Sequence, residues 1–140
     1  MVVVSTLATT LLGSCTTSPD AYYASLPRCE VVEPDLDFGE RCLAIPQARD
    51  YLKQFQREIL DAWQLPRGIS ADQRVTLSFG LRLDGSIQCL SLASDLREDI
   101  ARSVVAAFQR GTPFSRVPSE AACLTKLPIT ATFSNPVETP

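Results

Sequence analysis

Apolar side chains recur at every fourth position in the stretch from residue 47 to residue 65. The repeating residues are Tyr51, Phe55, Ile59 and Trp63. A spacing of four places side chains on one slowly drifting face of an α-helix, and the polar residues between them fall on the other face. Pro66 and Gly68 follow as helix-ending residues. We therefore predict an amphipathic helix over residues 47–65, with its aromatic face packed in a core.

Strict alternation of apolar and polar residues begins at position 75. The apolar set comprises Val75, Leu77, Phe79, Leu81 and Leu83. A period of two is typical of a β-strand with one buried face. Asp84-Gly85 supplies the tight turn of a hairpin, because glycine accepts a positive φ. In the returning strand the alternation shifts after Ile87, so we expect a β-bulge near Gln88 or Cys89.

A second helix is predicted over residues 96–110. Its apolar residues again repeat every four positions, at Leu96, Ile100, Val104 and Phe108. Ser94 and Asp95 are favourable N-cap residues, and Glu98 stands three positions after Asp95 in a capping-box arrangement. The helix is therefore expected to begin directly after this pair.

The last alternating stretch covers residues 126–135. Its apolar members are Leu127, Ile129, Ala131 and Phe133. Pro128 lacks a backbone donor, which favours an edge strand over a central strand. Apolar residues make up 45% of the 140-residue chain, enough for a single core. We predict an α+β fold in which a three-stranded antiparallel sheet carries two helices on one face, in the order α-β-β-α-β. The last strand should run antiparallel beside the first, at the edge.

The N-terminal residues MVVVSTLATTLLGS carry no charge, and their apolar run is too short to span a bilayer as a helix. Such a run fits the apolar region of a secretory signal peptide. The stretch Leu12-Gly13-Ser14-Cys15 resembles the bacterial lipobox, which directs lipid attachment to the cysteine and cleavage before it. The resemblance implies a signal peptide over residues 1–14 and lipidation at Cys15. The alternative is that residues 1–14 form a buried β-strand.

Residues 15–50 hold seven acidic and three basic residues, whereas the rest of the chain is nearly neutral. Pro27, Pro34, Gly39 and Pro46 interrupt this region, and the residues between them show neither a helical nor a strand period. We expect a lipid-anchored acidic linker over residues 15–45, one domain over 46–136 and a tail over 137–140. The net charge of −3 gives no basic footprint for nucleic acid.

The chain has five cysteines, and with Cys15 lipidated the other four can form two disulfides. Four cysteines permit three pairings, and the sequence does not choose strictly among them. We favour Cys29 with Cys42, which lie close together in the linker, and Cys89 with Cys123, which lie in the folded region. A zinc site is disfavoured because the chain has no histidine and its cysteine spacings are too wide for paired CxxC motifs. No metal or other cofactor is expected.

The order and spacing of these elements resemble the C-terminal domain shared by TonB and TolA, and the TolA-like branch most strongly. The resemblance is carried by the ladder from Tyr51 to Trp63 with Pro66, by the hairpin VTLSFGLRLDGSI and by the closing ITATFSNP. It covers about residues 46–136. It implies a module without enzymatic activity that binds another periplasmic or outer-membrane protein, frequently through an exposed sheet edge.

The edge of the last strand is therefore the candidate binding site. Its expected docking row comprises Ile129, Thr130, Ala131, Thr132 and Phe133. Main-chain hydrogen bonds would give affinity, and pockets for alternate side chains would give selectivity. The alternative is that Pro128 and the short length of the strand merely protect this edge from pairing.

Two other function classes stay open: a structural subunit of an envelope complex, and a thiol-based metal or redox protein. Asp95, Glu98 and Asp99 form a carboxylate cluster, but they are better explained as residues that complement a helix dipole. Because the chain has no histidine base, phosphate loop or nucleophile elbow, we expect no catalytic residue and no small-molecule substrate. The expected location is periplasmic, lipid-anchored to the envelope through Cys15. Thr16 favours the outer membrane by analogy with enteric lipoproteins.

Overall fold

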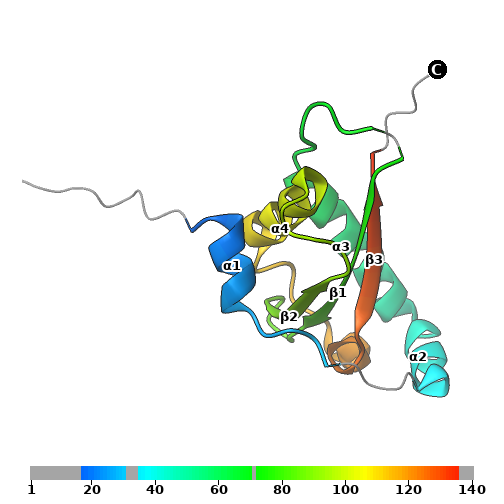
Figure 1. Ribbon diagram of the computed structural model, residues 1–140. Coiled ribbons are helices and arrows are strands. Elements are labelled where there is room, and N and C mark those ends of the chain that lie inside the picture. The colour runs from blue at the N-terminus through cyan, green and yellow to red at the C-terminus, as the bar shows by residue number, and fades with distance from the viewer. Residues whose placement is uncertain (1–16, 31–34, 71, 136–140) are drawn as a thin grey trace, which may run out of the picture.

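The computed structural model describes residues 17–30, 35–70 and 72–135. Its elements, in chain order, are α1 (Pro19–Ser25), α2 (Leu36–Leu43), α3 (Pro46–Ala62), β1 (Arg74–Leu81), β2 (Ile87–Leu92), α4 (Asp99–Gly111), the 3₁₀ helix η2 (Ser119–Lys126) and β3 (Ile129–Ser134). The three strands form one antiparallel sheet in the order β2-β1-β3 (Figure 1). The predicted α+β fold is confirmed, and so is the position of the last strand at the edge beside the first.

Helices α3 and α4 supply buried side chains to the core that includes the sheet. The spacing of four in α3 buries Tyr51, Phe55 and Ile59, and Phe108 of α4 is completely buried. The ring of Phe55 stacks on Phe79 of β1 with a centroid distance of 5.0 Å, and Phe108 meets Phe79 edge-on at 5.2 Å. Offset and edge-to-face contacts are the favoured geometries for aromatic pairs. The aromatic face of α3 lies in the core, as predicted.

Strand β1 buries Val75, Leu77, Phe79 and Leu81 as predicted, but the predicted fifth member, Leu83, lies beyond the end of the strand and is 52% exposed. The register with β2 pairs Gly80 with Cys89 and then Leu81 with Ile87, which leaves Gln88 as the extra residue of a bulge. A Cβ atom at Gly80 would lie 3.0 Å from the Cys89 sulfur. Glycine at this position therefore makes room for the sulfur, and the predicted bulge is confirmed.

The ends of the two long helices differ from the prediction. Helix α4 begins at Asp99, three residues later than expected, and its N-cap residue Glu98 makes no side-chain capping hydrogen bond. The Asp95 carboxylate instead accepts hydrogen bonds from the backbone N–H of Arg97 at 2.9 Å and from the Arg97 guanidinium at 2.7 Å. Asp95 thus stabilises a turn before the helix. Helix α3 ends three residues earlier than expected, at Ala62.

Two helices occupy the region that was predicted to be a linker. Helix α1 packs against α4, where Asp20 forms an ion pair with Arg102 at 3.2 Å and the Gln109 side chain donates to the Thr17 carbonyl at 2.6 Å. Helix α2 packs against α3 and η2 and buries Cys42. Helices this short depend on tertiary packing more than on their own propensity. Sequence period alone therefore could not reveal them.

The structure contains two disulfides, but the pairing favoured from the sequence is wrong. Cys29 bonds to Cys89 and Cys42 bonds to Cys123, with Cα–Cα distances of 5.0 and 5.8 Å. The segment that follows α1 carries Cys29 along β2, whereas Cys42 lies in α2 against η2. Cysteines that are near in sequence are thus carried to different parts of the domain. Each pairs with a residue far away along the chain.

Candidate protein-binding edge

The backbone groups of β1 point alternately toward β2 and toward β3, as in any antiparallel sheet. The carbonyl of Thr76 accepts a hydrogen bond from the N–H of Ala93 at 2.9 Å, on the β2 side. Alternation then directs the backbone of Leu77 toward β3, where its partner is Ala131. Because Ala131 must point back toward β1, the residues on either side of it direct their N–H and C=O groups away from the sheet.

These two outward-directed residues are Thr130 and Thr132. The hydroxyl of Thr132 lies 3.0 Å from that of Thr76, and the hydroxyl of Thr130 lies 3.4 Å from that of Ser78. Close side-chain approach is typical of the pairs in an antiparallel ladder that do not exchange main-chain hydrogen bonds. Both threonine side chains are exposed. Their hydroxyls therefore bond across one face of the sheet, while their backbone groups point out at its edge.

The opposite edge, at β2, is covered by the N-terminal segment of the same chain. The N–H of Leu90 donates to the Pro27 carbonyl at 3.0 Å, and the N–H of Leu92 donates to the Tyr23 hydroxyl at 3.0 Å. The Arg28 guanidinium donates to the Leu90 carbonyl at 3.0 Å and lies over the Tyr23 ring, 3.5 Å from its centroid. In Figure 1, α1 stands on the β2 side of the sheet and β3 on the other. The outward-directed N–H groups of Leu90 and Leu92 are thus satisfied internally.

The β3 edge is open across its central residues. Outside the ladder with β1, no hydrogen bond from any described residue reaches the backbone of Thr130 or Thr132. Pro128 immediately precedes the strand and shares the parity of these two threonines, so its missing N–H falls on the open side. The proline therefore limits pairing at that end but leaves the row of Thr130 and Thr132 intact. The strand has six residues, a length of roughly 20 Å.

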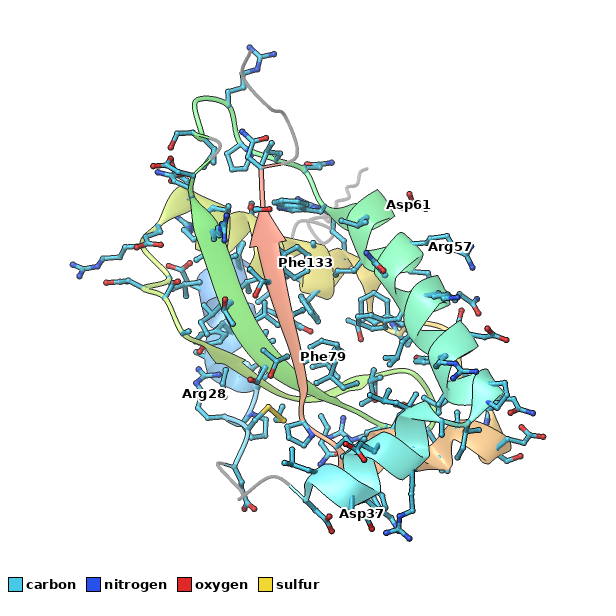
Figure 2. All side chains as sticks on the ribbon, turned by 90° about the vertical axis from the view of Figure 1, so that its right-hand side faces the viewer. Arg28, Asp37, Arg57, Asp61, Phe79 and Phe133 are labelled. Atoms are coloured by element: carbon cyan, nitrogen blue, oxygen red, sulfur yellow. A yellow bond between two sulfur atoms is a disulfide. The ribbon has the colours of Figure 1, made fainter. Side chains whose placement is uncertain are left out.

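A groove of about 470 Å³ runs between β3 and α3. One wall is β3 from Ile129 to Ser134. The other residues that line it are Leu52, Phe55, Gln56, Ile59, Leu60 and Phe79. Figure 2 shows Phe79 and Phe133 in the space between the strand and the helix. The lining residues include no charged side chain, so the groove accepts apolar groups from a partner.

Helix α3 and strand β3 run in the same direction along this groove (Figure 2). The ring of Trp63, which follows α3, contacts the ring of Phe133 near the end of β3, with centroids 5.4 Å apart. This edge-to-face contact joins the two walls at one end. The groove therefore has two unlike ends, one at Ile129 and one at the Trp63–Phe133 pair.

The structure places all five predicted docking residues in β3. Ile129, Ala131 and Phe133 direct their backbone groups toward β1, and Phe133 is buried. Thr130 and Thr132 supply the outward-directed backbone groups. The sequence therefore identified the strand, and the register of the sheet separates the residues that hold the strand in place from those that face the edge.

The α3 wall of the groove was not predicted. Leu52, Gln56 and Leu60 repeat every four positions beside the aromatic row. All three line the groove, and Leu60 is 46% exposed. The signal in the sequence was the pair Leu52 and Leu60, each of which stands one residue after a buried member of the aromatic row.

No family model matches the chain, and neither a curated protein nor a solved structure matches it at a significant level.

The other candidate sites considered from the sequence have less structural support than the β3 edge. Hydrogen bonds from the Arg97 side chain and backbone lower the pKa of Asp95, which explains part of the carboxylate cluster as local structure. The described residues contain no group of three or more histidine, cysteine, aspartate or glutamate side chains placed to hold a metal ion. Across that same part of the chain, no helix combines the length and apolar character needed to cross a membrane. Cys15 lies outside the described residues.

A polar cluster on α3 has a structural role. The Tyr51 hydroxyl donates to the Ser115 carbonyl at 2.7 Å, and the N–H and hydroxyl of Ser115 both donate to Glu58 Oε1 at 3.1 Å. Burial and the nearby Glu58 carboxylate raise the pKa of Tyr51 to about 12. These contacts tie the loop after α4 to α3.

Proposed function

We propose that this domain binds another protein by taking an extended segment of it as a fourth strand beside β3. The observation that carries the proposal is the difference between the two edges of the sheet. The chain covers the edge at Leu90 and Leu92 with its own residues, but leaves the edge at Thr130 and Thr132 open beside an apolar groove. Since proteins usually blunt or cover exposed edges, an edge left open beside a groove favours pairing with a partner.

The edge and the groove have separate tasks in such a complex. The N–H and C=O groups of Thr130 and Thr132 provide two donors and two acceptors for main-chain hydrogen bonds, which any sequence can make. Side chains alternate along the added strand, so every second one enters the groove between β3 and α3. The backbone therefore supplies affinity, and the groove supplies selectivity.

Mere protection of the edge explains less of the structure. Pro128 lies outside β3, and it removes a donor only at the end of the row. Protection also gives no reason for the partly exposed Leu60 beside the strand. Strand addition accounts for both observations.

We extend the proposal to the compartment. Two disulfides favour an oxidising environment such as the periplasm. The resemblance to the C-terminal domains of TonB and TolA supports a non-enzymatic module that contacts a periplasmic or outer-membrane protein. The lipobox-like stretch supports attachment to the envelope by a lipid on Cys15.

Site-specific photocrosslinking in the native envelope tests the proposal. A photoreactive residue at Thr130 should capture a defined partner, whereas the same residue at Gln88, on the bulge of β2, should not. The change Thr132→Pro should abolish the crosslink because it removes an outward N–H. Thr132→Ala is the matched control, since it keeps the N–H and loses only the hydroxyl and the γ-methyl group of the side chain. A crosslink from Thr130 that persists in Thr132→Pro would contradict strand addition.

A further inference from the structure

The α3 wall of the groove at the open edge is bordered on its outer side by a row of positive charge, which indicates the chemistry of the partner. We propose that the segment taken up beside β3 is acidic, with apolar side chains facing the groove and carboxylates near the end that meets Ile129. This inference rests on the proposed function, because it describes the segment that pairs with β3. It adds a charge preference that main-chain pairing does not supply.

The two faces of the added strand meet different surroundings. Partner residues directly opposite Thr130 and Thr132 fall on the hydroxyl-bearing face, where short polar side chains would extend the pairs made with Thr76 and Ser78. The intervening partner residues face the groove. Because the groove lining is uncharged, apolar side chains fit there.

Three cations run along α3 next to the groove. Arg49, Lys53 and Arg57 repeat every four positions, and each stands three residues before a residue that lines the groove. Those lining residues are Leu52, Gln56 and Leu60. Residues three apart are neighbours on a helix surface, so the cationic row forms the outer rim of this wall. All three cations are exposed, and Figure 2 shows Arg57 on the side of α3 away from β3.

The cations of this row form no ion pair within 4 Å among the described residues, although Asp50 lies three residues before Lys53 on the same helix. None of the ion pairs formed there includes Arg49, Lys53 or Arg57. The row also has the opposite sign to the chain, whose net charge is −3. The next residue at the same spacing is Asp61, at the end of α3 that meets Phe133. Since α3 and β3 run in the same direction, the positive charge lies toward the Ile129 end of the groove.

The expected size of the preference follows from the exposure of these side chains. Individual exposed ion pairs are weak, so two or three of them together predict about a tenfold preference for an acidic segment over a basic one. Salt screens such pairs, and at 1 M the Debye length falls to about 3 Å. The preference should therefore disappear at high salt, while main-chain pairing persists.

Two synthetic peptides test the inference on the folded chain. Both contain the same alternating valine–threonine centre, and they are flanked on both sides by glutamates in one and by lysines in the other. NMR titration gives each Kd, and amide hydrogen exchange reports protection at Thr130 and Thr132. We expect the glutamate peptide to bind about tenfold more tightly at low salt, with protection of both amides.

Charge reversal assigns the preference to the row. Arg49→Glu combined with Lys53→Glu should reverse the order of the two peptides. Arg67→Glu combined with Arg116→Glu makes the same change in net charge at exposed positions outside the groove lining, so it should leave the order intact. Thermal unfolding of both double variants checks that the fold is retained.

Three outcomes would overturn the inference. Equal affinity for both peptides, with both threonine amides still protected, would exclude the acidic preference and leave the proposed function standing. Failure of either peptide to protect Thr130 and Thr132 would count against the strand addition itself, and so against both proposals. Binding to phosphatidylglycerol vesicles that survives Thr132→Pro and is lost in Arg49→Glu/Lys53→Glu would assign the row to a lipid surface instead.

Discussion

Cys29 and Cys89 are joined by a disulfide beside the β2 edge, where the Cys29 N–H also donates a hydrogen bond to Ser91 Oγ at 2.7 Å. The bond fixes the segment whose residues Tyr23 and Pro27 cover β2. It links residues 60 positions apart in the sequence. The disulfide is therefore one of the contacts that hold the covering segment against this edge.

We expect Cys29→Ser/Cys89→Ser to lower the free energy of unfolding by about 2–4 kcal/mol, because a long loop is no longer closed in the unfolded chain. The amides of Leu90 and Leu92 should also lose protection in hydrogen exchange. Cys42→Ser/Cys123→Ser is the control: it should lower stability by a similar amount and leave those two amides protected. Equal loss of protection in both variants would show that the Cys29–Cys89 bond has no special role at this edge.

A pair of proline substitutions tests the backbone directions in β3. Ala131→Pro removes a donor from the ladder with Leu77, so the free energy of unfolding should fall by at least about 2 kcal/mol. Thr132→Pro removes an outward N–H and should cost less than about 1 kcal/mol. Urea denaturation of the two variants measures both values. The opposite ranking would mean that the outward-directed residues have been assigned to the wrong parity.

Two glycines are expected to respond in opposite ways to alanine. Gly85 has a φ of +88°, and a Cβ there would clash with the Phe114 carbonyl oxygen, so Gly85→Ala should destabilise by at least about 2 kcal/mol. Gly39 lies in α2 with no atom within 4 Å of the same position. Gly39→Ala should stabilise the protein by about 0.5–1 kcal/mol through helix propensity. Thermal unfolding of both variants checks the signs.

The raised pKa of Tyr51 predicts a loss of stability at high pH. Its value of about 12 lies above the ordinary value of 10, so folding favours the neutral phenol. The contribution is fully present below pH 10 and is lost as the pH rises toward 12. Tyr51→Phe should also cost about 1 kcal/mol near neutrality, since it loses the hydrogen bond to Ser115.

Urea denaturation of the wild type and of Tyr51→Phe across this pH range measures the effect. The difference between them should shrink from pH 10 to pH 12, because the wild type alone loses the contribution of this phenol. The other titrating groups are common to both proteins and cancel. A constant difference across the range would contradict the assigned shift.

Local periodicity predicted which side chains of the long helices and strands face the core. The spacing of four placed Phe55 in the core, and the alternation that shifts after Ile87 located the bulge at Gln88. In these elements the period of one short stretch decides which side chains face the core, although the neighbours they meet there, such as Phe79 for Phe55, come from other stretches. Tertiary contacts therefore reinforce the local pattern instead of overriding it.

The disulfides and the N-terminal helices could not be predicted in this way. The pairing of Cys42 with Cys123 depends on how α2 meets η2, a 3₁₀ helix with a weak sequence pattern. Helix α1 depends on contacts of Asp20 and Thr17 with α4, far away in sequence. Such long-range packing leaves no period in the stretch concerned.

The candidate site was predicted in part for the same reason. The proline pattern identified the strand from Ile129 to Phe133 as an edge. The outward direction of Thr130 and Thr132 required the register with β1, and the groove required the position of Leu60 relative to the strand. The strand itself could be predicted from the sequence, but the residues that lie beside it could be identified only from the fold.

The covered β2 edge has a consequence for self-association. If both edges were open, β3 of one copy could pair with β2 of the next, and this head-to-tail addition could continue without limit into a filament. Tyr23, Pro27 and Arg28 occupy the receiving edge and block that propagation. Two copies could still meet β3 to β3, but such a pair closes on itself by two-fold symmetry. Because the N-terminal segment covers β2, the open β3 edge of one copy has no β2 edge of another copy to extend, so head-to-tail growth stops at the first molecule.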